Sequence, residues 1–367
     1  MVVDVSPLFT PFELGSLQLP NRFVMAPMTR EFSPGGIPGA DVAAYYARRA
    51  AGNVGLIVTE GTFIDHAAAG DRTDVPQFYG EQALRAWQEV AQAVHDVGGR
   101  IVPQLWHRGA QRPAGSGPHP ETGSVSPSGS YPGLPGSRAM SLADIDEVVA
   151  SYARSAADAQ RLGFDGIELH GAHGYLLDQF LWSGTNLRTD VYGGGPAARA
   201  RFAAEVVAAC RAATSPTFPL VFRLSNWKAG DYQARLAQTP HELERLLTPL
   251  LDAGVDVFHV STRRHFEPAF PGSPLGLAGW VKKITARPTI TVGGVGLDGD
   301  LMTAYTAGGR ARTVPLDQLL DQFEEGQFDL VAVGRALLSD PEWVLKVQQG
   351  RFDELRSFDA ADRQKLA

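Results

Sequence analysis

The chain alternates short apolar runs with longer amphipathic stretches along most of its length, and this alternation constrains its fold most strongly. Eight runs are predicted to be β-strands, and most are continuously apolar, as expected for parallel strands buried on both faces. They comprise residues 22–27, 54–59, 100–104, 166–169, 220–224, 255–260, 289–292 and 330–333. Helical patterns separate most of these runs, so the sequence predicts a series of βαβ units.

Two predicted helices have clear boundaries. Residues 141–162 place apolar side chains at three- and four-residue spacing, which predicts one buried stripe: Leu142, Ile145, Val148, Val149 and Tyr152. Ser141 and Asp144 resemble a capping box, and Gly163 is placed to end this helix. The run Thr239-Pro240-His241-Glu242 opens a second helix, which Gly254 closes.

Eight βα repeats favour a (β/α)8 barrel of the TIM type over an open doubly wound sheet. No GxGxxG follows the first predicted strand, which counts against the dinucleotide-binding alternative. Residues 11–18 alternate around a Gly15-Ser16 turn and predict a hairpin that closes the barrel floor. We therefore expect residues 1–367 to form a single barrel domain, with long rim loops at 107–140 and 261–279.

Composition excludes several classes of protein. The net charge of −7 argues against a nucleic-acid partner, because nucleic-acid-binding proteins carry basic patches. Cys210 is the only cysteine, so an internal disulfide or a cluster held by several thiolates is impossible; we read Cys210 as a core residue. No apolar run is long enough to cross a membrane, and Met1-Val2-Val3-Asp4 does not resemble a leader. We expect a soluble, cytoplasmic protein.

Polar and small residues gather where the predicted strands end, and in a barrel these ends converge on one mouth. In chain order they are Ala26-Pro27-Met28-Thr29, Thr59-Glu60-Gly61, Gln104-Leu105-Trp106-His107, His170, His173, Arg223-Leu224-Ser225, Gly293-Gly294 and Gly334-Arg335. The glycine pair and Gly334-Arg335 follow the last two strands, where barrels commonly bind phosphate, although ordinary turns would also explain them. Arg223 needs an anionic or acceptor-rich partner, which a ligand or a neighbouring carboxylate would supply.

The segment from His170 to Tyr175 has two interpretations. Two imidazoles can hold one substrate oxygen while the phenol of Tyr175 delivers a proton. Alternatively, His170 and His173 are two ligands of a catalytic metal in a barrel lyase or hydrolase. Glu168 is near in sequence, but we expect its side chain to point away from the neighbours of His170. The residues favour the site without a metal.

Several segments of the chain resemble the old yellow enzyme family of flavin-dependent ene-reductases (the NADH:flavin oxidoreductase group). The most specific strings are residues 21–29, 170–177, 186–194 and 333–335, and the resemblance extends from Leu8 to about Trp343. It implies a non-covalent FMN at the barrel mouth, with NADH or NADPH as the reductant. Ala26, Pro27, Met28 and Thr29 would line the isoalloxazine, Gly61 and Gln104 would contact its pyrimidine edge, and Arg223 would lie by N1. Gly293, Gly294, Gly334 and Arg335 would hold the phosphate.

The resemblance also implies a reaction. His170 and His173 would hydrogen-bond a carbonyl or nitro oxygen, hydride from flavin N5 would add to the β-carbon, and Tyr175 would protonate the α-carbon. Trp106 would be a wall of the substrate pocket, although packing in the core or at the rim would also explain it. The implied partner is a small enone, enal or nitro compound, and the protein would be a monomer or homodimer. A non-catalytic flavin-binding protein is a further alternative. The choice between NADH and NADPH stays open, because Arg263, Arg264 and His265 would either meet a 2′-phosphate or simply be solvated.

Overall fold

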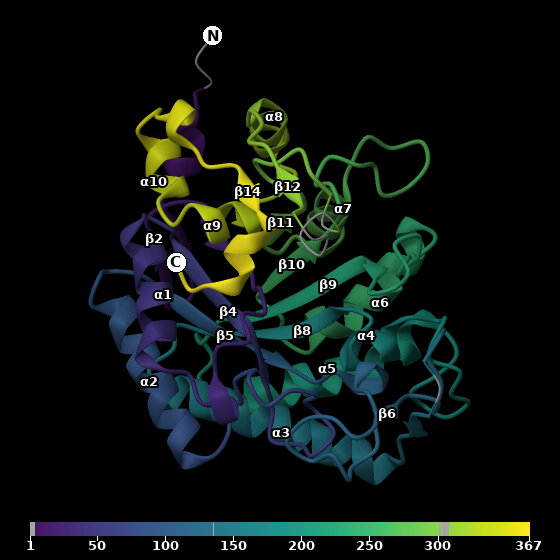
Figure 1. Ribbon diagram of the computed structural model, residues 1–367. Coiled ribbons are helices and arrows are strands. Elements are labelled where there is room, and N and C mark those ends of the chain that lie inside the picture. Colours follow the sequence, from purple (N-terminus) through teal and green to yellow (C-terminus); the bar gives the residue numbers. More distant parts are fainter. Residues whose placement is uncertain (1–3, 135, 301, 303–307) are drawn as a thin grey trace.

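The computed structural model describes residues 4–134, 136–300, 302 and 308–367, and its centre is a closed barrel of parallel strands (Figure 1). Neighbouring strands follow chain order, and the last pairs with the first. They are β3 (Phe23–Met25), β4 (Leu56–Phe63), β5 (Ile101–Trp106), β8 (Ile167–His173), β9 (Leu220–Lys228), β10 (Val257–Ser261), β11 (Thr289–Val292) and β13 (Leu330–Val333). The predicted TIM-type barrel is confirmed. Residues 1–3, part of the expectation about a leader, lie outside the described part of the chain.

Helices surround the barrel (Figure 1). The longer ones are α1 (Ala40–Ala51), α2 (Glu81–His95), α3 (Leu142–Arg161), α5 (Pro196–Ala212), α6 (Pro240–Asp252), α7 (Leu277–Thr285) and α8 (Asp317–Glu324). Three short helices, α4 (Leu176–Leu181), α9 (Arg335–Ser339) and α10 (Trp343–Gln348), follow strands or each other. Within the described residues, no helix combines the length and apolar character that crossing a membrane requires.

The predicted boundaries of α3 and α6 are confirmed. Ser141 and Asp144 form a reciprocal capping box at the start of α3, and the Thr239 side chain accepts a hydrogen bond from the backbone N–H of Glu242 in α6. The stripe predicted for α3 is correct at Ile145, Val148 and Tyr152 but wrong at Leu142, which is 56% exposed. Leu142 is the first residue of the helix, so its side chain lies before the first turn that packs on the barrel.

The predicted N-terminal hairpin closes one end of the barrel. Strands β1 (Phe12–Leu14) and β2 (Leu17–Leu19) pair antiparallel around the Gly15-Ser16 turn. Phe12, Leu17 and Leu19 join one buried apolar cluster with residues that begin the barrel strands, among them Val24, Leu56, Val102, Val221 and Val257. Because apolar side chains fill this end of the barrel, the polar site lies at the opposite end.

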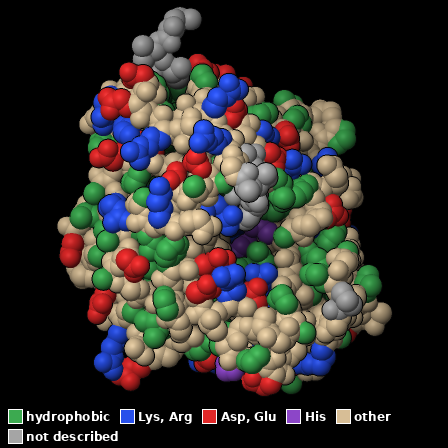
Figure 2. Space-filling view, in the orientation of Figure 1, with side chains coloured by type: hydrophobic (Ala, Val, Ile, Leu, Met, Phe, Trp, Pro, Cys, Tyr) green, Lys and Arg blue, Asp and Glu red, His purple; other side chains and the backbone are tan. Residues whose placement is uncertain are grey.

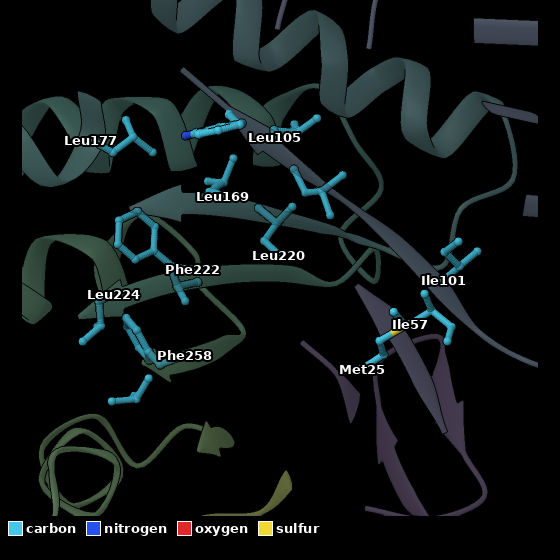
Figure 3. Close-up of a cluster of buried hydrophobic side chains, with 14 of the residues drawn as sticks. Met25, Ile57, Ile101, Leu105, Leu169, Leu177, Leu220, Phe222, Leu224 and Phe258 are labelled. Atoms are coloured by element: carbon cyan, nitrogen blue, oxygen red, sulfur yellow. The ribbon is translucent and has the colours of Figure 1, made fainter. Parts of the chain in front are cut away.

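A second apolar layer lies between the strands and the surrounding helices (Figure 3). Its strand members include Met25, Ile57, Ile101, Leu105, Leu169, Leu220, Phe222, Leu224 and Phe258, with Leu177 contributed by α4. Side chains alternate along a strand, so Leu169 in this layer leaves Glu168 and His170 to point into the barrel. Two apolar layers thus fix the direction of the polar interior residues.

Three strands extend four residues further toward the carboxyl end than predicted: β4 to Phe63, β8 to His173 and β9 to Lys228. Each extension contains glycine or polar residues, which the sequence interpretation assigned to loops. The strand pairings shift register between Val58 and Gly61 and between Gly171 and His173. Such bulges redirect side chains at the rims of barrels, and here they lie where the site is formed.

The rim segment 107–140 is more ordered than predicted. It contains a short helical turn (Gly109–Gln111) and two paired strands, β6 (Val125–Ser126) and β7 (Arg138–Ala139). The buried guanidinium of Arg112 donates to carbonyl oxygens of Gly70, Ser116 and His119 at 2.6–2.7 Å, and also to that of Thr122. Pro135 lies outside the described residues.

Candidate active site

A cavity of about 520 Å³ lies at the carboxyl end of the barrel strands. Figure 2 looks onto a hollow in this surface, with histidine side chains at its base and Lys or Arg side chains nearby. The cavity brings together nearly all the residues singled out from the sequence: Ala26, Pro27, Met28, Thr29, Gln104, Trp106, His170, His173, Tyr175, Arg223, Gly293, Gly294, Gly334 and Arg335. Seven of the eight barrel strands therefore contribute residues at or near their carboxyl ends to one site; β4 contributes none of the lining residues.

Among the residues expected to contact flavin or substrate, Gly61 alone does not line this cavity. A Cβ atom at this position would lie 2.6 Å from Cε3 of Trp106 and 3.3 Å from Oε1 of Gln104. The absence of a side chain at Gly61 therefore lets Trp106 and Gln104 occupy their places in the cavity wall.

His170, His173, Tyr175 and Trp106 form one aromatic cluster on the cavity wall. The ring centroids of His170 and His173 are 5.3 Å apart, and those of His170 and Tyr175 are 5.0 Å apart. Trp106 lies edge-on to Tyr175, with their ring centroids 4.8 Å apart, and is nearly parallel to His170 at 5.9 Å. Two imidazoles and a phenol thus face one space from the end of β8.

The local backbone explains why this strand ends as it does. His173 and Gly174 adopt left-handed conformations, with φ of 62° and 80°. The amide of Gln111 donates to the carbonyls of His173 and Gly174 at 3.1 and 2.9 Å, and the N–H of Gly174 donates to the Asp178 carboxylate at 2.6 Å. These bonds hold His173 in a conformation that is uncommon for a residue other than glycine.

A buried ion pair supports the same turn. Nζ of Lys228, the last residue of β9, lies 2.7 Å from the Asp178 carboxylate, and both side chains are fully buried. Burial raises the pKa of Asp178 and lowers the pKa of Lys228, since it disfavours the charged form of each. Lys228 also donates to the carbonyl of Ser225 within β9 at 3.1 Å. Because Asp178 belongs to α4, the ion pair links β9 to α4.

Burial keeps both histidines neutral. It lowers the pKa of His170 and of His173 well below the usual value, and the nearby guanidinium of Arg223 lowers both further. The rings of His173 and Trp227 stack with centroids 4.1 Å apart, and Nε2 of His173 shares a 2.8 Å hydrogen bond with the Ser261 hydroxyl. Neutral imidazoles can donate one N–H each without placing extra positive charge beside Arg223.

Glu168 occupies the barrel interior, so the expectation that it points away was wrong. Residues two apart on a strand share a face, and Glu168 therefore lies on the same side as His170. Its carboxylate accepts from the Gln104 amide at 2.7 Å and lies 2.6 Å from Nδ1 of His259. Burial acts to raise the pKa of Glu168, but His259, Arg223 and Gln104 outweigh it and lower the pKa overall.

Several buried nitrogen atoms of the cavity wall have no hydrogen-bond partner among the described residues. Among them are Nε of Arg223 and Nδ1 of His170. A buried donor without a partner costs about 1–3 kcal/mol, so these atoms call for a polar ligand. Gly334 presents open space, because the nearest atoms to a Cβ placed there are Sδ of Met28 at 3.6 Å and Cβ of Ala26 at 3.8 Å. The wall fits a flat heterocycle with polar edges.

The candidate phosphate end lies on the same cavity. Gly294 has a φ of 68°, which glycine adopts readily, and Gly293 and Gly334 leave their backbones accessible. The guanidinium of Arg335 lines the cavity and donates to the carbonyls of Gly299 and Asp300 at 2.6 and 2.8 Å. The predicted glycines and Arg335 are therefore adjacent, as phosphate binding requires.

Several residues of the site were missed by sequence reasoning. Trp227 and Ser261 lie just beyond the predicted ends of their strands and contact His173. The guanidinium of Arg108 lies over the rings of Trp106 and Tyr175, with Cζ 5.3 and 5.5 Å from their centroids. His259 was detectable as a polar residue inside the apolar run 255–260. Arg363 lines the cavity from the far end of the chain, and no local pattern signals this.

The arrangement of ligating side chains does not favour a metal. Among the described residues, no group of three or more His, Cys, Asp or Glu side chains could hold an ion. Catalytic zinc sites use three protein ligands, and within the described part of the chain His170 and His173 have no third.

Comparisons with known proteins agree with this geometry. A family model described as the NADH:flavin oxidoreductase / NADH oxidase family matches residues 7–354. The 12-oxophytodienoate reductase 7 of Oryza sativa subsp. japonica is 34% identical over 359 residues, covering 92% of this chain and 87% of that protein. An NADH oxidase of Thermoanaerobacter brockii is 33% identical over 95% of this chain, which spans only 52% of that longer protein.

Solved structures give the same result. Morphinone reductase in complex with tetrahydroNAD superposes with a TM-score of 0.79 at 29% identity, covering 94% of this chain and 90% of that one. The old yellow enzyme homologue of Zymomonas mobilis gives a TM-score of 0.78 at 26% identity, covering 93% and 92%. The chain therefore belongs to the NADH:flavin oxidoreductase / NADH oxidase family, and within it to the old yellow enzyme type.

Proposed function

We propose that this protein is an NAD(P)H-dependent, FMN-containing reductase of activated alkenes, acting on α,β-unsaturated carbonyl compounds and on nitroalkenes. The observation that carries the proposal is the cluster of His170, His173 and Tyr175 on the wall of a cavity that Gly293, Gly294 and Arg335 also line. A polar oxygen clamp, a proton donor and a phosphate-binding end are the parts that such a reaction needs.

The residues present fit FMN. The unpartnered Nε of Arg223 would donate to the N1–C2 carbonyl edge of the ring system, and its positive charge would favour the reduced, anionic form. The Gln104 amide donates to Glu168, which turns its oxygen toward the cavity to accept from the pyrimidine edge. Ala26, Pro27, Met28 and Thr29 would line the ring system. When bound, FMN would supply the hydride-transfer chemistry between the nicotinamide and the alkene.

His170 and His173 would bind the substrate oxygen. Burial and Arg223 hold both imidazoles neutral, so each can donate one N–H and draw charge from the alkene. Ser261 lines the cavity and shares Nε2 of His173, so a substrate oxygen would displace its hydroxyl. Trp106 would close the pocket beside the substrate.

Tyr175 would donate the proton that completes the reduction. Its phenol lies beside His170, so it would reach the α-carbon of a substrate whose oxygen rests on the histidines. Proton transfer leaves a phenolate, and the guanidinium of Arg108 over the same ring would stabilise that negative charge.

The direct test has two stages. Purified protein should be yellow and release about one equivalent of FMN on denaturation. Under anaerobic conditions NADPH or NADH should bleach the flavin, and 2-cyclohexen-1-one should restore its colour. A colourless protein that gains no colour on incubation with FMN would contradict the proposal. A flavin that is bleached but never reoxidised by any enone would indicate a flavin-binding protein without ene-reductase activity.

A further inference from the structure

A second cavity of about 310 Å³ lies beside the central one, between the loop that follows β9 and the loop that follows β10. The two cavities share Trp227, Tyr232, Thr262 and Arg263 in their walls. A long ligand that occupies the central cavity can therefore continue into this outer pocket. Nothing in the proposed chemistry of the central cavity uses it.

The shared wall is a stack of flat side chains that begins at His173. The ring of Trp227 lies against His173 on one side and Tyr232 on the other, with centroids 4.1 and 5.4 Å apart. The guanidinium of Arg263 lies over Tyr232, with Cζ 5.0 Å from the ring centroid. Flat aromatic and guanidinium faces bind the π-faces of nucleobases.

The outer pocket is positively charged although the whole chain has a net charge of −7. Arg235, Arg263 and Arg264 line it, against the single carboxylate of Glu267. Arg263 is neutralised by an ion pair with Asp300. The guanidinium groups of Arg235 and Arg264 then outnumber the one lining carboxylate, so the pocket keeps a net positive charge that attracts an anion.

These two groups bind only backbone oxygens in the described part of the chain. Arg235 donates to the carbonyl of Ala269 at 2.8 Å, and Arg264 donates to the carbonyl of Asp298 at 2.7 Å. Neither forms a salt bridge with a carboxylate of the described residues. The carbonyl bonds hold both groups at the pocket wall. His265, which the sequence also offered as a partner for a 2′-phosphate, is buried against Gln322. It is therefore not available to the outer pocket.

We propose that the outer pocket binds the adenosine 2′-phosphate end of NADPH while the nicotinamide end occupies the central cavity. The inference rests on the proposed function, since only a nicotinamide reductant bound in the central cavity would extend into the outer one. The phosphate meets Arg235 and Arg264, and the adenine stacks on the Tyr232–Arg263 face. NADH lacks this phosphate, so the pocket makes NADPH the preferred reductant.

The test uses fragments that need no turnover. Binding of 2′,5′-ADP and of 5′-AMP to the flavin-loaded protein is measured by calorimetry. We expect 2′,5′-ADP to bind at least about tenfold more tightly, the size of one charge-assisted hydrogen bond. Arg235→Gln should reduce that ratio to about threefold or less, while Arg235→Lys should retain most of it. Arg85→Met, at an exposed position on α2, is the matched control and should leave the ratio unchanged.

Two results would overturn the inference: equal affinity for the two fragments in the unaltered protein, or the same ratio after Arg235→Gln. Steady-state kinetics provide a second readout. Arg235→Gln should raise KM for NADPH about tenfold with kcat unchanged, and should not alter either constant for NADH. A protein that discriminates between the fragments but shows no flavin turnover would refute the proposed function and leave this pocket as a 2′-phosphate site.

Discussion

At the scale of single residues, Glu168 shows how one buried carboxylate directs several neighbours. It accepts hydrogen bonds from Gln104 and His259 in the barrel interior. The first contact fixes which end of the Gln104 amide faces the cavity, and the second fixes the proton of His259 on Nδ1. The pKa of Glu168 is lowered and that of His259 is also lowered, so the pair is an ionised carboxylate with a neutral imidazole.

Replacing Glu168 with Gln should therefore weaken both stability and flavin binding. We expect the free energy of unfolding to fall by about 1.5–3 kcal/mol, the range for a hydrogen bond to a charged group. FMN affinity should fall about tenfold, because Gln104 loses its fixed orientation. Urea denaturation and fluorescence titration with FMN measure the two effects. Glu89→Gln on the exposed face of α2 is the control. If Glu168→Gln changed the free energy of unfolding and the FMN affinity no more than this control, Glu168 would not direct its neighbours as described.

Glu60 gives a pH prediction. Burial raises its pKa from 4.5 to about 7, although the backbone N–H of Arg30 partly offsets this at 2.8 Å. The folded state therefore binds a proton more tightly than the unfolded state. The resulting stability is complete below pH 4.5 and is lost as the pH rises through 7.

Glu60→Gln removes this dependence. The free energy of unfolding of the unaltered protein, relative to the variant, should fall by about 3 kcal/mol between pH 4.5 and pH 8. Urea titrations of both proteins across this range measure the difference. A difference that stays constant with pH would show that folding does not raise the pKa of Glu60.

At the scale of elements, the turn between β8 and α4 depends on the buried pair of Asp178 and Lys228. Removing one partner of a buried ion pair leaves an uncompensated charge, which costs about 3–5 kcal/mol. Lys228→Met should cause a loss of this size in the free energy of unfolding. It should also weaken the binding of phenols, whose oxygen would bind His170 and His173 in place of the substrate oxygen. The reason is that the conformation of His173 is no longer held.

Chemical denaturation and ligand titration test this. Lys282→Met, which breaks the more exposed pair with Asp329, is the matched control and should cost less than about 1 kcal/mol. The double variant Lys228→Met/Asp178→Asn should recover part of the loss, because neither charge then remains buried. If Lys228→Met lowered the free energy of unfolding no more than Lys282→Met, the turn between β8 and α4 would not depend on the pair of Asp178 and Lys228.

At the scale of the whole molecule, the barrel strands and their order could be predicted from the sequence because continuous apolar runs have few other solutions. The polar interior could not be predicted in full. Glu168 shares the inward face of β8 with His170, contrary to the expectation that it points away, and Trp227 lies beyond the predicted end of β9. Arg363 reaches the cavity only through tertiary packing, which no local pattern records.

The closed topology predicts that the chain unfolds as one unit. Every barrel strand is paired on both sides, and the N-terminal hairpin fills the floor, so no strand can separate without exposing the core. Tryptophan fluorescence and far-UV circular dichroism should therefore report the same urea midpoint. Two separated transitions would contradict the proposal of a single domain over residues 1–367.

The measurement that tests the central proposal most directly is rapid-mixing kinetics of Tyr175→Phe. Reduction of the flavin by NADPH should stay within about twofold of the unaltered rate, because the phenol takes no part in that step. Reoxidation by 2-cyclohexen-1-one should slow by about 10²–10⁴, the usual contribution of a general acid. Equal losses in both half-reactions, or an unchanged rate of reoxidation, would contradict the assignment of Tyr175 as the proton donor.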